Sequence, residues 1–222
     1  MKTTRAAFVV AGLALAAYPV LRPWGSEVGQ EGAETFGSTA WLVSHALGML
    51  GFVALAFGLR AAAAAGPAWH GVMPLRRVET RAWVAVALLL PYYGAEAYGL
   101  HALGRHVGET GDLGALEIAD AFRYAPFEMT TFALGLGALA LVGGNLVLGH
   151  WRDGGAARWG GVLAGLGLLT YLPQFFGPAE LRVAHGVVLG AGLLMVAVTL
   201  RPGHRDEVTG PEATQSPLTL TS

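Results

Sequence analysis

The sequence predicts an all-α fold, an integral membrane bundle of six transmembrane helices. Two properties of the composition predict this class: 54% of the 222 residues are hydrophobic and only 13% are charged, and the mean hydropathy is +0.50. A single soluble core does not need so much apolar material. The third observation is that this material is concentrated in six long runs, each near the roughly 20 residues that a spanning helix requires.

The six runs cover residues 6–21, 39–59, 82–103, 125–149, 159–177 and 182–200. Because lipid offers the backbone no hydrogen-bond partners, we expect each run to be helical. Residues 1–200 therefore form one six-helix transmembrane domain, in which Pro173 permits a kink in the fifth helix. Residues 201–222, with their Gly, Pro, Thr and Ser content, are expected to form a disordered cytoplasmic tail.

The first run has two interpretations. The sequence MKTTR followed by AAFVVAGLALAAY is compatible with a signal peptide that is cleaved near residues 14–16. The apolar run continues to Leu21, which is long for the apolar part of a signal peptide and favours a retained helix.

The distribution of basic residues predicts the orientation. With the N-terminus inside, ten Lys and Arg residues lie on the inner side and four on the outer side. This asymmetry satisfies the positive-inside rule. We therefore expect a multi-pass protein of the plasma membrane with both termini in the cytoplasm.

Two outer connections are long. Residues 22–38 are acidic and are expected to be flexible. Residues 110–124 carry Leu113, Leu116 and Phe122 at helical spacing, which is typical of a short interfacial helix over the outer mouth of the bundle. A solvated connector is the alternative.

Four runs contain a polar side chain at a common depth. Each of these side chains was measured from the arginine at the inner end of its own run. His45 and Glu96 lie 15 positions from that arginine, and Gln174 and His185 lie 16 positions from it. At about 1.5 Å per residue this is roughly 22–24 Å, which lies in the outer third of a hydrocarbon layer about 30 Å thick. Ionisable side chains are costly in lipid and normally face the bundle interior. The sequence therefore predicts one polar cluster that opens outward.

Glu96 lies within PYYGAEAYGLH, where Tyr92 and Tyr93 share its helical face, whereas His101 lies on a different face. The candidate catalytic residues are Glu96, His45 and His185. The candidate substrate-binding residues, on the wall or rim of the cluster, are Tyr92, Tyr93, Glu128, Tyr171, Gln174 and Phe175.

A buried carboxyl group and a buried imidazole that titrate near neutral pH act as general acid and base. The favoured hypothesis is a proton-handling enzyme that acts on a lipophilic substrate such as an isoprenoid, with aromatic rings shielding a developing cation. A proton-coupled small transporter would use the same groups.

Other interpretations use the same side chains. His45, His185 and Glu96 form a two-histidine, one-carboxylate set that suits zinc or non-haem iron. The two histidines alone would bind a b-type haem between the second and sixth runs. In a non-catalytic structural or accessory protein, the polar groups would only satisfy one another. The sequence leaves the cofactor undetermined.

Cysteine is absent, which excludes disulfides, thiolate metal sites and thiol catalysis. The net charge of −1 gives no electrostatic support to a nucleic-acid partner. The expected partners are membrane lipids and a lipophilic small molecule, and the sequence does not predict an oligomeric state.

At PYYGAEAYGLHALG and LPQFFGPAELRVAHG the chain resembles small uncharacterised membrane proteins of high-GC actinobacteria. The resemblance covers most of the chain from the second run onward. It implies a helical membrane bundle, and it implies no particular activity, cofactor or functional residue.

Overall fold

The computed structural model describes residues 2–66 and 70–200, and within these ranges all regular structure is helical. The predicted tail, residues 201–222, lies outside the described residues. The helices in chain order are α1 (Lys2–Leu21), α2 (Gly29–Gly37), α3 (Thr39–Ala65), α4 (Leu75–Gly94), the π-helix η1 (Ala95–Gly99), α5 (Leu100–Thr110), the 3-10 helix η2 (Leu113–Leu116), α6 (Glu117–Arg123), α7 (Pro126–His150), α8 (Gly155–Leu169), the 3-10 helix η3 (Pro173–Phe176) and α9 (Ala179–Thr199).

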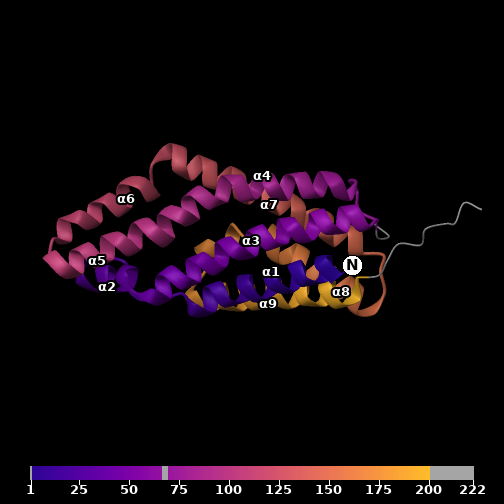
Figure 1. Cartoon of the computed structure of the whole chain (residues 1–222), viewed down its shortest axis with the longest axis horizontal. Helices are drawn as coiled ribbons and strands as arrows, with labels where there is room; N and C mark the ends of the chain where they lie inside the picture. The colour runs from indigo at the N-terminus through magenta and orange to yellow at the C-terminus, as the bar shows by residue number, and fades with distance from the viewer. Residues whose placement is uncertain (1, 67–69, 201–222) are drawn as a thin grey trace, which may run out of the picture.

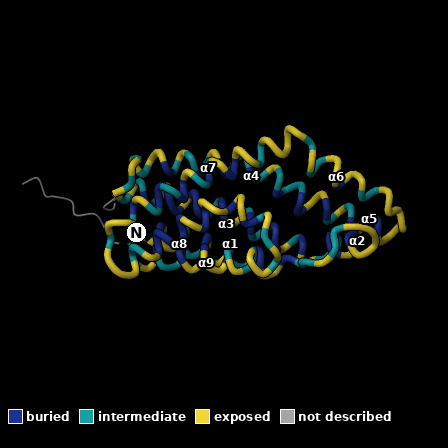
Figure 2. Tube along the Cα trace, turned by 180° about the vertical axis from the view of Figure 1, so that it is seen from behind, coloured by how far each residue is buried: buried dark blue, intermediate teal, exposed yellow. Residues whose placement is uncertain are grey.

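Six long helices pack side by side in a closed ring. The order around the ring is α1, α3, α4, α7, α8, α9 and back to α1, so that α1 separates α3 from α9. Apolar side chains such as Phe52, Leu89, Leu139 and Leu193 fill the space between them. Figure 2 shows the buried residues on the facing sides of these helices and the exposed ones outside. The expected helical bundle is therefore present.

Four of the described helices are long and apolar enough to cross a membrane, namely α1, α3, α7 and α9. Two predicted runs are divided. Residues 82–103 are shared among α4, η1 and α5, and the first turns of α4 are charged. Residues 159–177 are divided because α8 ends at Leu169. In a continued helix the ring of Pro173 would clash with the carbonyl of Leu169, four residues earlier.

The other helices form an extension at the end of the ring remote from the N-terminus (Figure 1). The helical rod α4–η1–α5 continues beyond the ring, and α2 packs along α5. The prediction that residues 22–38 are flexible is wrong for α2, because Ala33 and Phe36 are buried there. Residues 113–123 are helical, which agrees with the predicted helix and also with a connector that has helical propensity.

Candidate functional site

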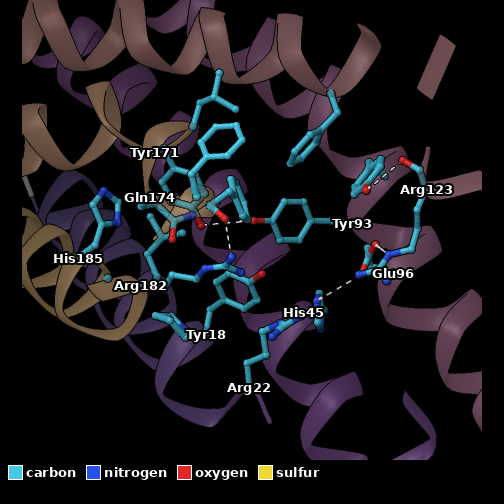
Figure 3. Close-up of a pocket in the computed structure, with 18 of the residues that line it drawn as sticks. Tyr18, Arg22, His45, Tyr93, Glu96, Arg123, Tyr171, Gln174, Arg182 and His185 are labelled. Atoms are coloured by element: carbon cyan, nitrogen blue, oxygen red, sulfur yellow. Dashed lines mark hydrogen bonds and ion pairs between the residues drawn. The ribbon is translucent and has the colours of Figure 1, made fainter. Parts of the chain in front are cut away.

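A cavity of about 540 Å³ lies where the ring meets the extension. Its wall comes from the end of α1, the start of α3, the α4–η1 junction, α6, α7, η3 and the start of α9 (Figure 3). Eight of the nine candidate residues line it: His45, Tyr92, Tyr93, Glu96, Tyr171, Gln174, Phe175 and His185. The structure thus brings together side chains that are up to 140 positions apart, as from His45 to His185.

Glu128 is the exception. It is exposed, lies in the first turn of α7 and does not line the cavity. A carboxylate in the first turn of a helix interacts favourably with the helix dipole. Its position in the first turn of α7 is therefore explained without a ligand.

Glu96 is held by an arginine from the extension. The Nε of Arg123 lies 2.7 Å from Oε1 of Glu96, and an Nη atom lies 3.4 Å from Oε2. Both side chains are largely buried. A carboxylate that receives two guanidinium hydrogen bonds is stabilised in its ionised form, so the contacts with Arg123 favour an anionic Glu96.

The backbone positions Glu96 through an unusual turn. Glu96 lies in the π-helix η1, whose wider turn shifts the backbone hydrogen-bonding register. The carbonyl of Glu96 accepts a hydrogen bond of 2.7 Å from the indole N–H of Trp41 on α3. The turn and the indole together fix the carboxylate at the cavity wall.

His45 faces Glu96 across the junction of α3 and η1. Its Nδ1 lies 2.8 Å from the carbonyl oxygen of Trp41, and its Nε2 lies 3.9 Å from Oε2 of Glu96. Because a carbonyl only accepts, we assign the proton of the neutral ring to Nδ1. Nε2 then carries a lone pair beside a carboxylate, and it is the basic atom of the cavity.

The anionic and cationic groups form a network. Glu27, which precedes α2, lies 2.8 Å from Arg123 and also pairs with Arg22 at the end of α1. Burial opposes the ionisation of Glu27, but the charges of Arg123 and Arg22 outweigh it and hold its pKa below the usual range. Burial alone would lower the pKa of Arg123, but the carboxylates of Glu96 and Glu27 raise it. Glu27 and Arg123 are therefore both charged near neutral pH.

Aromatic rings make up much of the remaining wall. Tyr92 stacks on Phe132 with ring centroids 4.3 Å apart, and Phe132 meets Phe175 at 5.8 Å. The hydroxyl groups of Tyr93 and Tyr171 are 3.4 Å apart and share a hydrogen bond. These rings give the cavity a predominantly apolar surface.

The lining residues that are exposed show where the cavity opens. Tyr124, Met129, Leu172 and Phe176 are exposed, and Phe176 is 86% accessible. A rim of large apolar side chains is unfavourable in water and suits contact with lipid.

Comparison of the chain with models of known protein families, with curated proteins and with solved structures found no match. The function is therefore inferred from the geometry of the cavity.

His185 lies apart from the other two candidate catalytic residues. Its Nε2 is 2.9 Å from the carbonyl oxygen of Gly167 and 3.2 Å from Oγ1 of Thr170, near the end of α8. The imidazole thus contacts the backbone at the C-terminal end of a helix, where carbonyl groups lack partners. His185 and His45 lie at opposite sides of Tyr18 in Figure 3.

This arrangement does not favour the metal and haem interpretations. Among the described residues, no group of three or more His, Asp or Glu side chains is placed to hold a metal ion. A haem between α3 and α9 requires these helices to face each other, but α1 lies between them. Tyr18 of α1 packs edge-on against His45 at 5.4 Å and occupies that space.

Three arginines and one glutamate of the cavity were missed as site residues. Arg22, Arg123, Arg182 and Glu27 were assigned to outer connections only. A signal was present, because each arginine lies at the outer boundary of an apolar run. An arginine at that boundary reaches the depth of the polar cluster through its long side chain.

Proposed function

We propose that this chain is an integral protein of the plasma membrane with six spanning segments and both termini in the cytoplasm. The closed ring of six helices supports this number, since the rod α4–η1–α5 and the pair α8 and η3 stand beside the four longer apolar helices. The ratio of ten inner to four outer basic residues supports the orientation.

We further propose that the cavity handles a proton of a lipophilic substrate. The observation that carries this proposal is the pair of His45 and Glu96, in which Nδ1 is committed to a carbonyl and Nε2 is directed toward a carboxylate. His45 is the general base, and Glu96 stabilises the imidazolium that forms when Nε2 takes the proton. In the reverse direction the imidazolium is the general acid.

This assignment changes the role of Glu96, which the sequence analysis expected to donate or accept the proton. Glu96 would have to be protonated to act as the acid, and its contacts with Arg123 oppose protonation. Glu96 is therefore the counterion, and His45 carries the mobile proton. His185, the third candidate catalytic residue, has no role in the proposed proton transfer, because its Nε2 contacts Gly167 and Thr170.

The substrate class follows from the wall and the rim. The rings of Tyr92, Phe132 and Phe175 line a cavity whose exposed edge is also apolar. A molecule that is dissolved in the lipid enters such an opening without crossing water. An isoprenoid would fit this surface, and its cationic intermediates would be stabilised by the aromatic faces.

The test measures protonation directly. Infrared difference spectra of the reconstituted protein, recorded from about pH 8 down to about pH 3 so that they include histidines that titrate below the ordinary range, are expected to contain an imidazole component that is absent in His45→Gln and altered in Glu96→Gln. His101→Gln is the matched control, since the Nδ1 of His101 also faces a carbonyl, that of Phe36, but His101 lies outside the cavity. An unchanged response in His45→Gln would refute proton handling by this residue.

A second measurement separates an enzyme from an accessory protein. Lipids extracted from membranes that contain wild type, His45→Gln or His101→Gln are compared by mass spectrometry. An enzyme converts a lipophilic species in wild type and His101→Gln membranes, and loss of a general base slows that conversion by roughly two orders of magnitude or more. Identical lipid profiles in all three would favour a structural or accessory role.

A further inference from the structure

The side of the cavity opposite His45 holds an arginine without a carboxylate partner. Arg182 of α9 donates from Nε to the carbonyl of Gly177 at 2.9 Å and from an Nη atom to the carbonyl of Phe175. Among the described residues, no carboxylate lies within ion-pair distance of Arg182. The two carbonyl contacts fix the guanidinium group and leave its other Nη group available (Figure 3).

Gln174 lies beside this guanidinium group, on η3. It is only 9% exposed and lines the cavity. Its backbone N–H bonds to the carbonyl of Thr170, but in the described part of the chain its carboxamide has no hydrogen-bond partner. The carboxamide therefore keeps its hydrogen-bonding capacity for a molecule in the cavity. A bound molecule that accepts a hydrogen bond would use this capacity.

The charge count indicates the sign of that molecule. The cavity wall contains Arg22, Arg123 and Arg182 against Glu27 and Glu96, so with neutral histidines it carries one excess positive charge. The two carboxylates are already paired with Arg22 and Arg123. The excess charge is therefore located at Arg182.

We propose that Arg182 and Gln174 form a headgroup subsite for a singly charged anionic amphiphile, a carboxylate or phosphodiester attached to an apolar chain. The oxyanion accepts hydrogen bonds from the guanidinium and carboxamide groups, and the chain lies against Phe132 and Phe175. The inference rests on the proposed function, because it places the bound molecule with its polar end at Arg182 and an inner part near His45.

Charge and preorganisation make this subsite specific. An arginine that two carbonyls hold in place loses little side-chain entropy on binding. A hydrogen bond that involves a charged group contributes about 1.5–3 kcal/mol, which corresponds to roughly a 10- to 150-fold change in affinity. An uncharged lipid with the same chain gains only the apolar contacts.

The experiment uses the full chain in discs of phosphatidylcholine and three probes: palmitate, hexadecanol and acetate. Palmitate is expected to bind at least roughly tenfold more tightly than hexadecanol. Arg182→Gln and Gln174→Leu should each weaken palmitate binding by a similar factor and leave hexadecanol binding almost unchanged. Arg105→Gln is the control, since Arg105 pairs with Glu109 on the exposed face of α5.

Each other result overturns the inference in a distinct way. Equal binding of palmitate and hexadecanol would show that the cavity binds lipids without selecting for a charged headgroup. Acetate that competes as well as palmitate would indicate a simple anion site, and unchanged palmitate affinity in Arg182→Gln would place the headgroup elsewhere. Arg182→Lys keeps the charge and provides a second variant if Arg182→Gln does not fold. Because the infrared response is recorded on the ligand-free protein, the proposed function can fail while this inference holds, and the reverse.

Discussion

Glu96 lies in a wall that is otherwise largely aromatic, and the residue that neutralises it comes from a different part of the chain. Arg123 belongs to α6, and it also contacts Glu27 before α2. One guanidinium group thus ties the extension to the ring. The fork of an arginine suits this task because it donates to two carboxylates at once.

This role predicts a large effect of Arg123→Gln. The substitution leaves the buried Glu96 and the partly exposed Glu27 with one fewer cation, and breaking a buried pair such as Arg123–Glu96 costs roughly 3–5 kcal/mol. The loss is measured as the decrease in the free energy of unfolding of the reconstituted protein. Removing Glu96 as well, in the Arg123→Gln and Glu96→Gln double variant, should recover part of it.

The control for this prediction is Arg105→Gln. Arg105 pairs with Glu109 four residues later on α5, and both side chains are well exposed, at 64% and 68%. Exposed pairs of this kind contribute little to stability. A decrease of the same size in both variants would show that the buried network has no special importance.

At the scale of the element, α5 is the helix that positions α2. Gly104 faces the backbone of α2, where an added Cβ would lie 2.9 Å from the carbonyl carbon of Phe36 and still closer to Gly37 and Ala33. Backbone atoms cannot rotate away as the end of a side chain does. Only glycine permits this approach of the two helices.

Gly104→Ala is therefore expected to displace α2, with a cost of roughly 1–3 kcal/mol for overpacking. Hydrogen exchange of residues 29–37 should become faster, because their packing against α5 is lost. Gly108→Ala is the matched control one helical turn further on, where nothing lies within 4 Å of the added Cβ. Alanine has the higher helix propensity, so Gly108→Ala should stabilise the helix by up to about 1 kcal/mol. Equal exchange rates for α2 in both variants would contradict this account.

The π-helix η1 is the element that sequence periodicity did not reveal. The prediction of which residues share a face with Glu96 assumed a regular α-helix, but the turn widens between Gly94 and Gly99. Both glycines have low helix propensity, which makes an irregular turn less costly there. Many regular helices contain such pairs, so the spacing alone did not predict the π-turn.

At the scale of the whole molecule, Glu109 and Arg152 lie at opposite ends. Glu109 lies near the end of α5 in the extension, and Arg152 lies in the turn between α7 and α8. In the proposed orientation these ends face the outside and the cytoplasm, respectively.

The absence of native cysteine makes this arrangement testable by labelling. In intact cells, an impermeant thiol reagent should modify Glu109→Cys and should not modify Arg152→Cys until the membrane is opened. Modification of Arg152→Cys alone would reverse the orientation. Modification of both from outside would require a different number of spanning segments.

The sequence by itself determined the helical class, the positions of the apolar helices α1, α3, α7 and α9, and the distance of each polar residue along its own helix. These properties depend on apolar content and on the constant rise of an α-helix, which can be counted along the chain. The common depth of His45, Glu96, Gln174 and His185 is of this kind, and the structure places all four on one cavity.

Only the tertiary structure decided how these residues are paired. The rotation of each helix, the π-turn at Glu96 and the folding of α2 and α6 toward the ring determine that His45 faces Glu96 and that Arg123 binds it. They also leave Arg182 without a carboxylate partner among the described residues. Sequence spacing fixes how far a residue lies along its own helix, but a contact between helices depends on packing among segments that are distant in the chain. For that reason the position of each site residue along its helix followed from counting, and the pairing of these residues followed from the fold.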